Sequence, residues 1–140
     1  MPFPKKLEST IMKFLWNNDF NVNKQGRVEV RCLECNKSLG SEPRPHCSAH
    51  VLSKGSYSAL RIHRQNIIPL CVAHHQQLDF GKSREMKIYD FLDERKLFLK
   101  NVYNQMKNQF YDYNESEHMY ELIKVGCYTD QEIEEIMNSL

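Results

Sequence analysis

The chain has 140 residues, of which 41% are hydrophobic and 26% charged, with a formal net charge of +1. This composition is typical of a single modest globular domain. Because no run of about 18 apolar residues occurs, and no continuous apolar segment follows the first residues, the sequence predicts neither a membrane span nor a secretory signal. We therefore expect a cytoplasmic location.

The first part of the chain, residues 1–26, reads as an N-terminal helical segment. Apolar side chains recur at helical spacing over residues 7–16 and predict a short amphipathic helix that ends near residues 17–19. The next residues, 27–31, alternate between polar and apolar side chains, which predicts a short strand.

The middle part, residues 27–82, holds most of the cysteines and histidines. Two brief apolar pieces at 50–52 and 67–70 favour short strands, and residues 71–79 have helical character. The sequence thus predicts strand, loop, strand and helix around a metal, an α+β fold with a small zinc-stabilised core.

The last part, residues 83–140, is predicted to be a helical extension packed on that core. Apolar side chains recur near helical spacing from Ser83 to about Phe110, which indicates one long helix. Two shorter helices are expected at 120–124 and at 130–137, the second behind a Thr129 cap.

The small net charge conceals an uneven distribution. Residues 1–84 carry 13 Lys and Arg against 6 Asp and Glu, whereas residues 85–140 carry 6 against 12. A positive surface around a metal site attracts polyanions, so nucleic acid is the expected partner. The simpler interpretation is that these charged side chains are only solvated surface residues without a ligand.

Five cysteines are an odd number, and their close spacing suits metal ligation better than a disulfide framework. Two pairs of soft ligands are present, Cys32 with Cys35 and Cys71 with His74. Each pair can point at one ion, the first from a turn and the second from the start of a helix. The spacing predicts a Cys3His site for a structural Zn²⁺.

Two alternatives exist for the fourth ligand of this site. Cys47 or His46 could replace His74, because both lie in the loop between the two pairs. Otherwise Cys47 and Cys127 are expected to be free thiols.

Residues 32–82 resemble an HNH, or ββα-metal, endonuclease module, and within that group the phage NinG and Rap type. The matching text is Cys-Leu-Glu-Cys at 32–35, Ser-Ala-His-Val-Leu-Ser-Lys-Gly at 48–55, Leu-Arg at 60–61 and Asn-Ile-Ile-Pro-Leu-Cys-Val-Ala-His-His at 66–75. The order His, Asn, His inside paired zinc ligands is the most specific part of the match. The resemblance covers a little over a third of the chain.

The resemblance implies a role for three residues. His50 takes the position of the general base that removes a proton from the attacking water, and an imidazole suits this role because its ordinary pKa lies near 6.5. Asn66 takes the position of the residue that braces the loop and aims the base. His75 takes the position of a ligand to a catalytic Mg²⁺ or Mn²⁺.

The sequence departs from the commonest HNH pattern just before the base. Ala49 stands where that pattern often has a metal-binding Asp or His. Asp79, four residues after His75 on a helix, could supply a carboxylate, although it also reads as a solvated acid at a helix end. His46 is a weaker candidate for this ligand. If neither residue binds the ion, water and the substrate phosphate would complete its coordination sphere.

Several basic residues lie where phosphate contacts would help, although each also reads as ordinary surface. They are Lys54, Arg61, Arg64 and Lys82. Phosphate contacts carry no sequence information, so the chain gives little reason to expect sequence-specific reading.

Two functions follow from these features. The first is a metal-dependent DNA endonuclease, a hydrolase of phosphodiester bonds, which the NinG and Rap resemblance would direct to branched DNA recombination intermediates in a bacterial host cell. Junction cutting implies a homodimer, and the long helix after Ser83 could supply its surface. The second is a catalytically silent zinc module that binds nucleic acid or protein through the same basic face.

Overall fold

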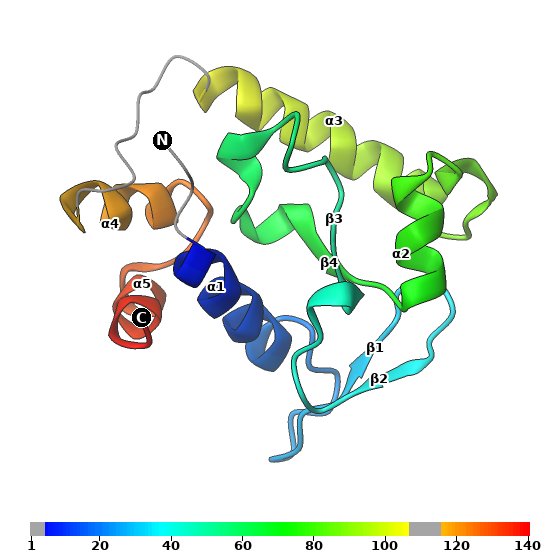
Figure 1. The fold of residues 1–140 in the computed structure, drawn as a ribbon, viewed down its shortest axis with the longest axis horizontal. Helices are drawn as coiled ribbons and strands as arrows, with labels where there is room; N and C mark the ends of the chain where they lie inside the picture. Colours follow the sequence, from blue (N-terminus) through cyan, green and yellow to red (C-terminus); the bar gives the residue numbers. More distant parts are fainter. Residues whose placement is uncertain (1–4, 107–115) are drawn as a thin grey trace.

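A computed structural model of the chain describes residues 5–106 and 116–140 as a mixed α+β fold (Figure 1). Its helices are α1 (Lys5–Asn18), α2 (Val72–Asp79), α3 (Tyr89–Met106), α4 (Ser116–Lys124) and α5 (Asp130–Asn138). Its strands are β1 (Val30–Arg31), β2 (Ser38–Gly40), β3 (Ser48–His50) and β4 (Ile67–Pro69). None of the helices in these two ranges is long and apolar enough to cross a membrane.

The strands form two separate antiparallel pairs rather than one sheet. β3 pairs with β4 in the register Ser48 to Pro69, Ala49 to Ile68 and His50 to Ile67. Figure 1 shows this ribbon near the middle of the molecule, with α3 along one side. Successive residues of a strand face opposite ways, so Ala49 is fully buried in the core while its neighbour His50 is only partly buried.

The strand predicted at 50–52 is displaced toward the N-terminus. The structure places β3 at Ser48–His50, so that His50 ends the strand instead of beginning it. Beyond His50, the side chain of Asn66 hydrogen-bonds both the N–H and the C=O of Leu52, in place of a partner strand. This long-range contact ends the ladder, and local sequence preference does not reveal it.

The second pair, β1 with β2, is a hairpin that carries the first two cysteines. The predicted strand at 27–31 is reduced to Val30–Arg31, and β2 was not predicted. In the connecting turn Cys32 N–H donates to Lys37 O, and Asn36 N–H donates to Cys32 O. Asn36 adopts a φ of 62°, a left-handed conformation that Asn tolerates better than most residues.

One hydrophobic core joins all three segments predicted from the sequence. It includes residues of α1, of the middle ribbon and of the C-terminal helices. Fully buried members are Leu7, Ile11, Leu15, Trp16, Leu60, Leu70, Leu92, Leu99, Ile123 and Ile133. The N-terminal helix and the C-terminal extension therefore pack on the same core as the cysteine-containing middle.

Helix α3 begins later than predicted, at Tyr89 rather than Ser83. Residues Ser83–Glu85 form only a single 3-10 turn. Just before α3, the carboxylate of Glu34 accepts hydrogen bonds from the backbone N–H groups of Lys87 and Ile88. Glu34 belongs to the cysteine hairpin, so a distant residue sets this helix start. The predicted end near 110 and the break at 112–116 lie outside the described residues, apart from Ser116, which begins α4.

Of the other helices, α1, α2 and α5 agree closely with the sequence, whereas α4 begins at Ser116, four residues before the start predicted at 120. α1 contains the helix predicted at 7–16, and α2 covers the helix predicted at 71–79 except for Cys71, which is its N-cap. α5 begins behind Thr129, which forms a reciprocal capping box with Glu132.

Arg64 connects the two ends of the chain to the middle. Its guanidinium binds the carboxylate of Asp19 and that of Glu132, with four N–O distances of 2.7 Å. It also lies over the rings of Phe14 and Tyr128. Arg64 lowers the pKa of Glu132 to about 2. The pairing is bidentate and partly buried, a geometry that stabilises more than an ordinary surface ion pair.

The Glu132→Gln variant tests this clamp. Glutamine keeps the capping box but loses the charge. A carboxyl pKa lowered by folding stabilises above the unfolded pKa of about 4.5, and this stability is lost as the pH falls toward about 2. We expect the variant to lose about 1–3 kcal/mol of unfolding free energy at pH 7, measured by urea denaturation. The difference in unfolding free energy between the wild type and the variant should narrow below about pH 4.5. A difference that does not depend on pH would contradict the assignment.

Candidate metal centre and histidine cleft

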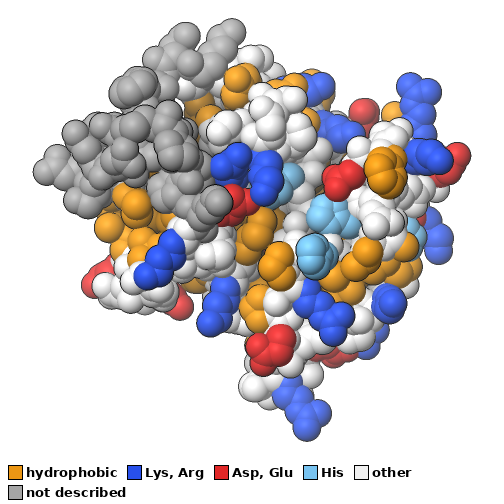
Figure 2. Space-filling view, viewed as in Figure 1, with side chains coloured by type: hydrophobic (Ala, Val, Ile, Leu, Met, Phe, Trp, Pro, Cys, Tyr) orange, Lys and Arg blue, Asp and Glu red, His pale blue; other side chains and the backbone are white. Residues whose placement is uncertain are grey.

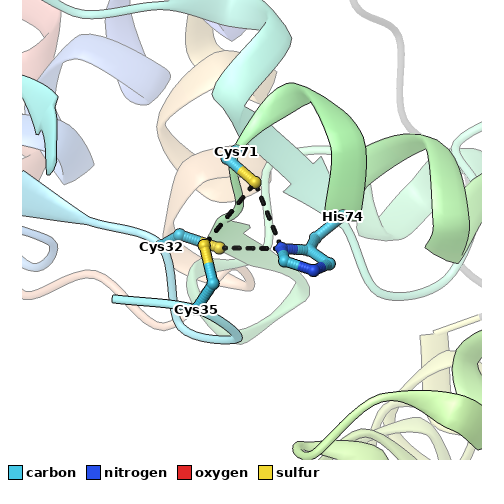
Figure 3. Close-up of side chains that lie close together, drawn as sticks. All are labelled: Cys32, Cys35, Cys71 and His74. Atoms are coloured by element: carbon cyan, nitrogen blue, oxygen red, sulfur yellow. Dashed lines mark hydrogen bonds between the residues drawn. The ribbon is translucent and has the colours of Figure 1, made fainter. Parts of the chain in front are cut away.

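Four sequence-predicted ligands converge in the structure. The ligand atoms of Cys32, Cys35, Cys71 and His74 all lie within 4.8 Å of one another. Figure 3 shows the two cysteines of the β1–β2 hairpin facing Cys71 and His74 at the start of α2. The hairpin turn and the first turn of the helix thus each supply two ligands.

The spacing of these atoms fits a tetrahedral zinc site. Cys35 Sγ lies 3.8 Å from Cys71 Sγ, and His74 Nδ1 lies 3.7 Å from Cys32 Sγ and 3.1 Å from Cys71 Sγ. Zinc bonds of about 2.3 Å to sulfur and 2.0 Å to nitrogen would separate neighbouring ligands by roughly 3.5–3.8 Å. Three thiols and one imidazole are a donor set that can hold a structural zinc.

Neither alternative fourth ligand joins the cluster. Cys47 is buried beside it, and burial raises the pKa of its thiol, which keeps it protonated. The side chain of His46 lines a different part of the surface. The pKa of the Cys35 thiol is shifted in the opposite direction. It is lowered, chiefly by a hydrogen bond from the Lys37 backbone.

An open cleft of about 1190 Å³ lies on the other side of α2. Its walls are α1, the segment 43–48, the end of β3, the loop 53–58 and α2. Figure 2 shows histidine side chains close to the middle of this face, with Lys and Arg side chains around them. The cleft brings His46 and His50 together with His75 and Asp79, two pairs that lie more than 20 residues apart in the sequence.

His50 is held by one ring nitrogen. Its Nε2 lies 2.8 Å from the backbone oxygen of Arg61, and because a carbonyl only accepts, Nε2 carries the proton. In the neutral ring Nδ1 is then unprotonated. Burial lowers the pKa of His50 below its ordinary value, although the Arg61 hydrogen bond and the Glu8 carboxylate act in the opposite direction. Near pH 7 the ring is therefore neutral and able to accept a proton.

His75 is held in the same manner, through its other nitrogen. Its Nδ1 lies 2.6 Å from the backbone oxygen of His46, and its Nε2 lies 3.3 Å from Asp79 Oδ2. A donated Nδ1–H leaves Nε2 available as a ligand, which is the usual arrangement of a metal-binding imidazole. Adjacent residues of a helix point about 100° apart, so His74 faces the thiols while His75 faces the cleft.

Asn66 lies behind the cleft, fully buried. Its Oδ1 accepts from Leu52 N–H at 2.7 Å, and its Nδ2 donates to the backbone oxygens of Leu52 and Leu60 at 3.1 Å each. One side chain thus fastens both ends of the loop between β3 and the next turn. That loop leads to Arg61, whose carbonyl holds His50.

The four predicted phosphate-binding residues separate in the structure. Lys54 and Arg61 line the cleft, whereas Arg64 and Lys82 do not. Arg64 is instead bound to Asp19 and Glu132, so its placement does not support the predicted phosphate contact.

Three charged cleft residues were not identified from the sequence, namely Glu8, Lys13 and Lys96. They come from α1 and α3, outside the motif, and no local pattern marks them.

Comparisons with protein-family models, with curated proteins and with solved structures find no match to this chain.

We expect purified protein to contain about one zinc per chain by elemental analysis. Cys35→Ser should remove the zinc and lower the melting temperature by roughly 10 °C or more, because metal binding stabilises the folded state directly. Cys47→Ala is the matched control, since this buried thiol lies outside the ligand set. Loss of zinc from Cys47→Ala with retention in Cys35→Ser would contradict the assignment.

Asn66→Asp tests the loop brace with a side chain of equal size. A carboxylate cannot donate to the oxygens of Leu52 and Leu60, so the variant should lose about 2–4 kcal/mol of unfolding free energy in urea denaturation. Asn104→Asp, at an exposed position of α3, should change it by less than about 0.5 kcal/mol. Equal effects at the two positions would show that Asn66 has no special role.

Proposed function

We propose that the protein is a metal-dependent endonuclease that hydrolyses phosphodiester bonds in DNA. The observation that carries the proposal is the cleft itself. It places a neutral imidazole, His50, in the same concavity as an imidazole–carboxylate pair, His75 and Asp79. Two histidines with different free nitrogens can serve two different steps of one hydrolysis.

In this proposal His50 is the general base. With Nε2 fixed on the Arg61 carbonyl, Nδ1 accepts the proton of the attacking water. The backbone contact holds the ring in one orientation, which reduces the loss of entropy in the reaction. Asn66 acts through the loop that it fastens and is a positioning residue.

His75 and Asp79 are proposed to hold a divalent cation. His75 Nε2 and Asp79 Oδ2 are 3.3 Å apart, near the roughly 3 Å between neighbouring ligands of an octahedral site. A bound Mg²⁺ or Mn²⁺ would neutralise charge on the phosphate and on the leaving oxygen. Ala49 cannot contribute, because it faces the core. Two protein ligands leave most of the sphere to water and phosphate, as Mg²⁺ tolerates.

Cations around the cleft support a polyanionic substrate. Lys54, Arg61, Lys13 and Lys96 all line it. A preference for branched recombination intermediates rests on the NinG and Rap resemblance. The homodimer that junction cutting requires could use α3, which exposes Leu97 and Phe98.

The second candidate is a zinc module that binds nucleic acid or protein without cutting it. One observation favours it: the cation site has only two protein ligands, because the position before His50 is turned into the core. Both candidates predict DNA binding, and only the first predicts cleavage.

His50→Ala decides between the two. We expect it to reduce Mg²⁺- or Mn²⁺-dependent nicking of plasmid DNA by about 10²–10⁴-fold while DNA affinity and zinc content are retained. Asn104→Ala, at an exposed position of α3 that does not line the cleft, is the control. It should retain most of the activity.

If the wild type cleaves no form of DNA with any divalent ion, the binding module replaces the nuclease. Comparison of a four-way junction, a flap, a linear duplex and a single strand addresses substrate choice. Equal rates on all four would contradict selectivity for branched DNA.

A further inference from the structure

A carboxylate stands among the cations of the cleft. Glu8, in the first turn of α1, lines the cleft with only 14% of its side chain exposed. Its Oε1 lies 3.4 Å from Lys54 Nζ, and its Oε2 lies 3.8 Å from Arg61 Nε. Lys54 and Arg61 come from the segment between β3 and β4, so α1 brings an anion to them from another part of the chain.

This arrangement matches the way in which proteins bind a phosphate. A carboxylate offers two acceptor oxygens to cationic donors, as a phosphate does, and Lys and Arg bind either group. The two separations are longer than the roughly 2.7–2.9 Å of a tight charge-assisted hydrogen bond. Glu8 thus lies close enough to compensate both charges, yet it is not tightly engaged.

The location of this group matters for the reaction. Glu8 shares the cleft with His50 and acts electrostatically on its ring. A phosphate bound by Lys54 and Arg61 would therefore lie beside the proposed base. The same cleft carries a second acid, Asp79, on the opposite wall formed by α2, but that carboxylate contacts His75 rather than a lysine or arginine.

We propose that Glu8 occupies a substrate-phosphate position in the free protein, and that nucleic acid binds by exchanging its phosphate for this carboxylate. The inference rests on the proposed function in taking a nucleic acid as the ligand. Glu8 lowers the affinity for any polyanion that cannot displace it, so it acts as a selecting residue. A substrate must offer enough contacts elsewhere in the cleft to compensate for the exchange.

Glu8→Gln is the direct test, because glutamine has the same shape and a similar helix propensity but no charge. Glu134→Gln, at an exposed position of α5, is the matched control with the same change in net charge. Each protein is titrated against a fluorescent single-stranded oligonucleotide and against a duplex of equal length. The titrations are repeated from about 50 to about 200 mM salt, without added divalent ions.

We expect Glu8→Gln to bind roughly 3–10-fold more tightly than Glu134→Gln at low salt, because an anion that competes with phosphate has been removed. The slope of log affinity against log salt should steepen by about 0.7–0.9, the value for one additional phosphate contact. A slope and an affinity equal to those of Glu134→Gln would overturn the proposal. So would weaker binding by Glu8→Gln, or the absence of binding by every variant.

A double mutant distinguishes the exchange of the Glu8 carboxylate for phosphate from a general effect of the substitution on the fold. If Glu8 acts on phosphate through Lys54, the gain from Glu8→Gln should shrink by at least about 2-fold in a Lys54→Ala background. A gain of unchanged size in that background, together with an unchanged gain in an Arg61→Lys background, would overturn the assignment. Melting temperatures and zinc content of all variants show whether each is folded.

The binding experiment can fail or succeed independently of the cleavage experiment. If no variant cleaves DNA but Glu8→Gln binds more tightly than its control, the endonuclease proposal fails and the exchange stands. If the wild type cleaves DNA but Glu8→Gln and its control bind alike, the endonuclease stands and the exchange fails.

Discussion

The convergence of three thiols and one imidazole is the constraint from which the rest of the fold follows. The hairpin supplies Cys32 and Cys35, and the start of α2 supplies Cys71 and His74, so a bound zinc would join two elements that lie far apart in the sequence. This junction fixes the first turn of α2, and with it the direction of the next residue, His75. Glu34, between the two hairpin cysteines, also caps the start of α3. One small turn therefore sets the positions of two helices.

The two histidines of the cleft are oriented by backbone carbonyls rather than by carboxylates. His50 donates through Nε2 to Arg61 and His75 donates through Nδ1 to His46. A backbone carbonyl remains an acceptor at every pH, so these orientations do not depend on the ionisation of a partner. The opposite choice of nitrogen leaves a different one available in each ring. Two chemically identical side chains can in this way take different parts in the proposed reaction.

The charges of the basic half of the chain are less available than their number suggests. Arg64 is matched by two carboxylates and connects the ends of the chain, so it serves the fold. Lys54 and Arg61 face Glu8. Sequence counting adds charges without regard to these pairings, and the field that a ligand meets is weaker than the excess of Lys and Arg over residues 1–84 implies.

The sequence by itself determined the features that depend on neighbours along the chain. The helices at 7–16, 71–79 and 130–137 follow from apolar spacing and from the Thr129 cap, and the four candidate metal ligands follow from their pairing. The tertiary structure decided what depends on distant partners. Asn66 ends β3, Glu34 begins α3, and α1 closes the cleft with Glu8. A hydrogen bond or ion pair across 14 to 54 positions leaves no local pattern, because it forms only when the core has brought the two segments together.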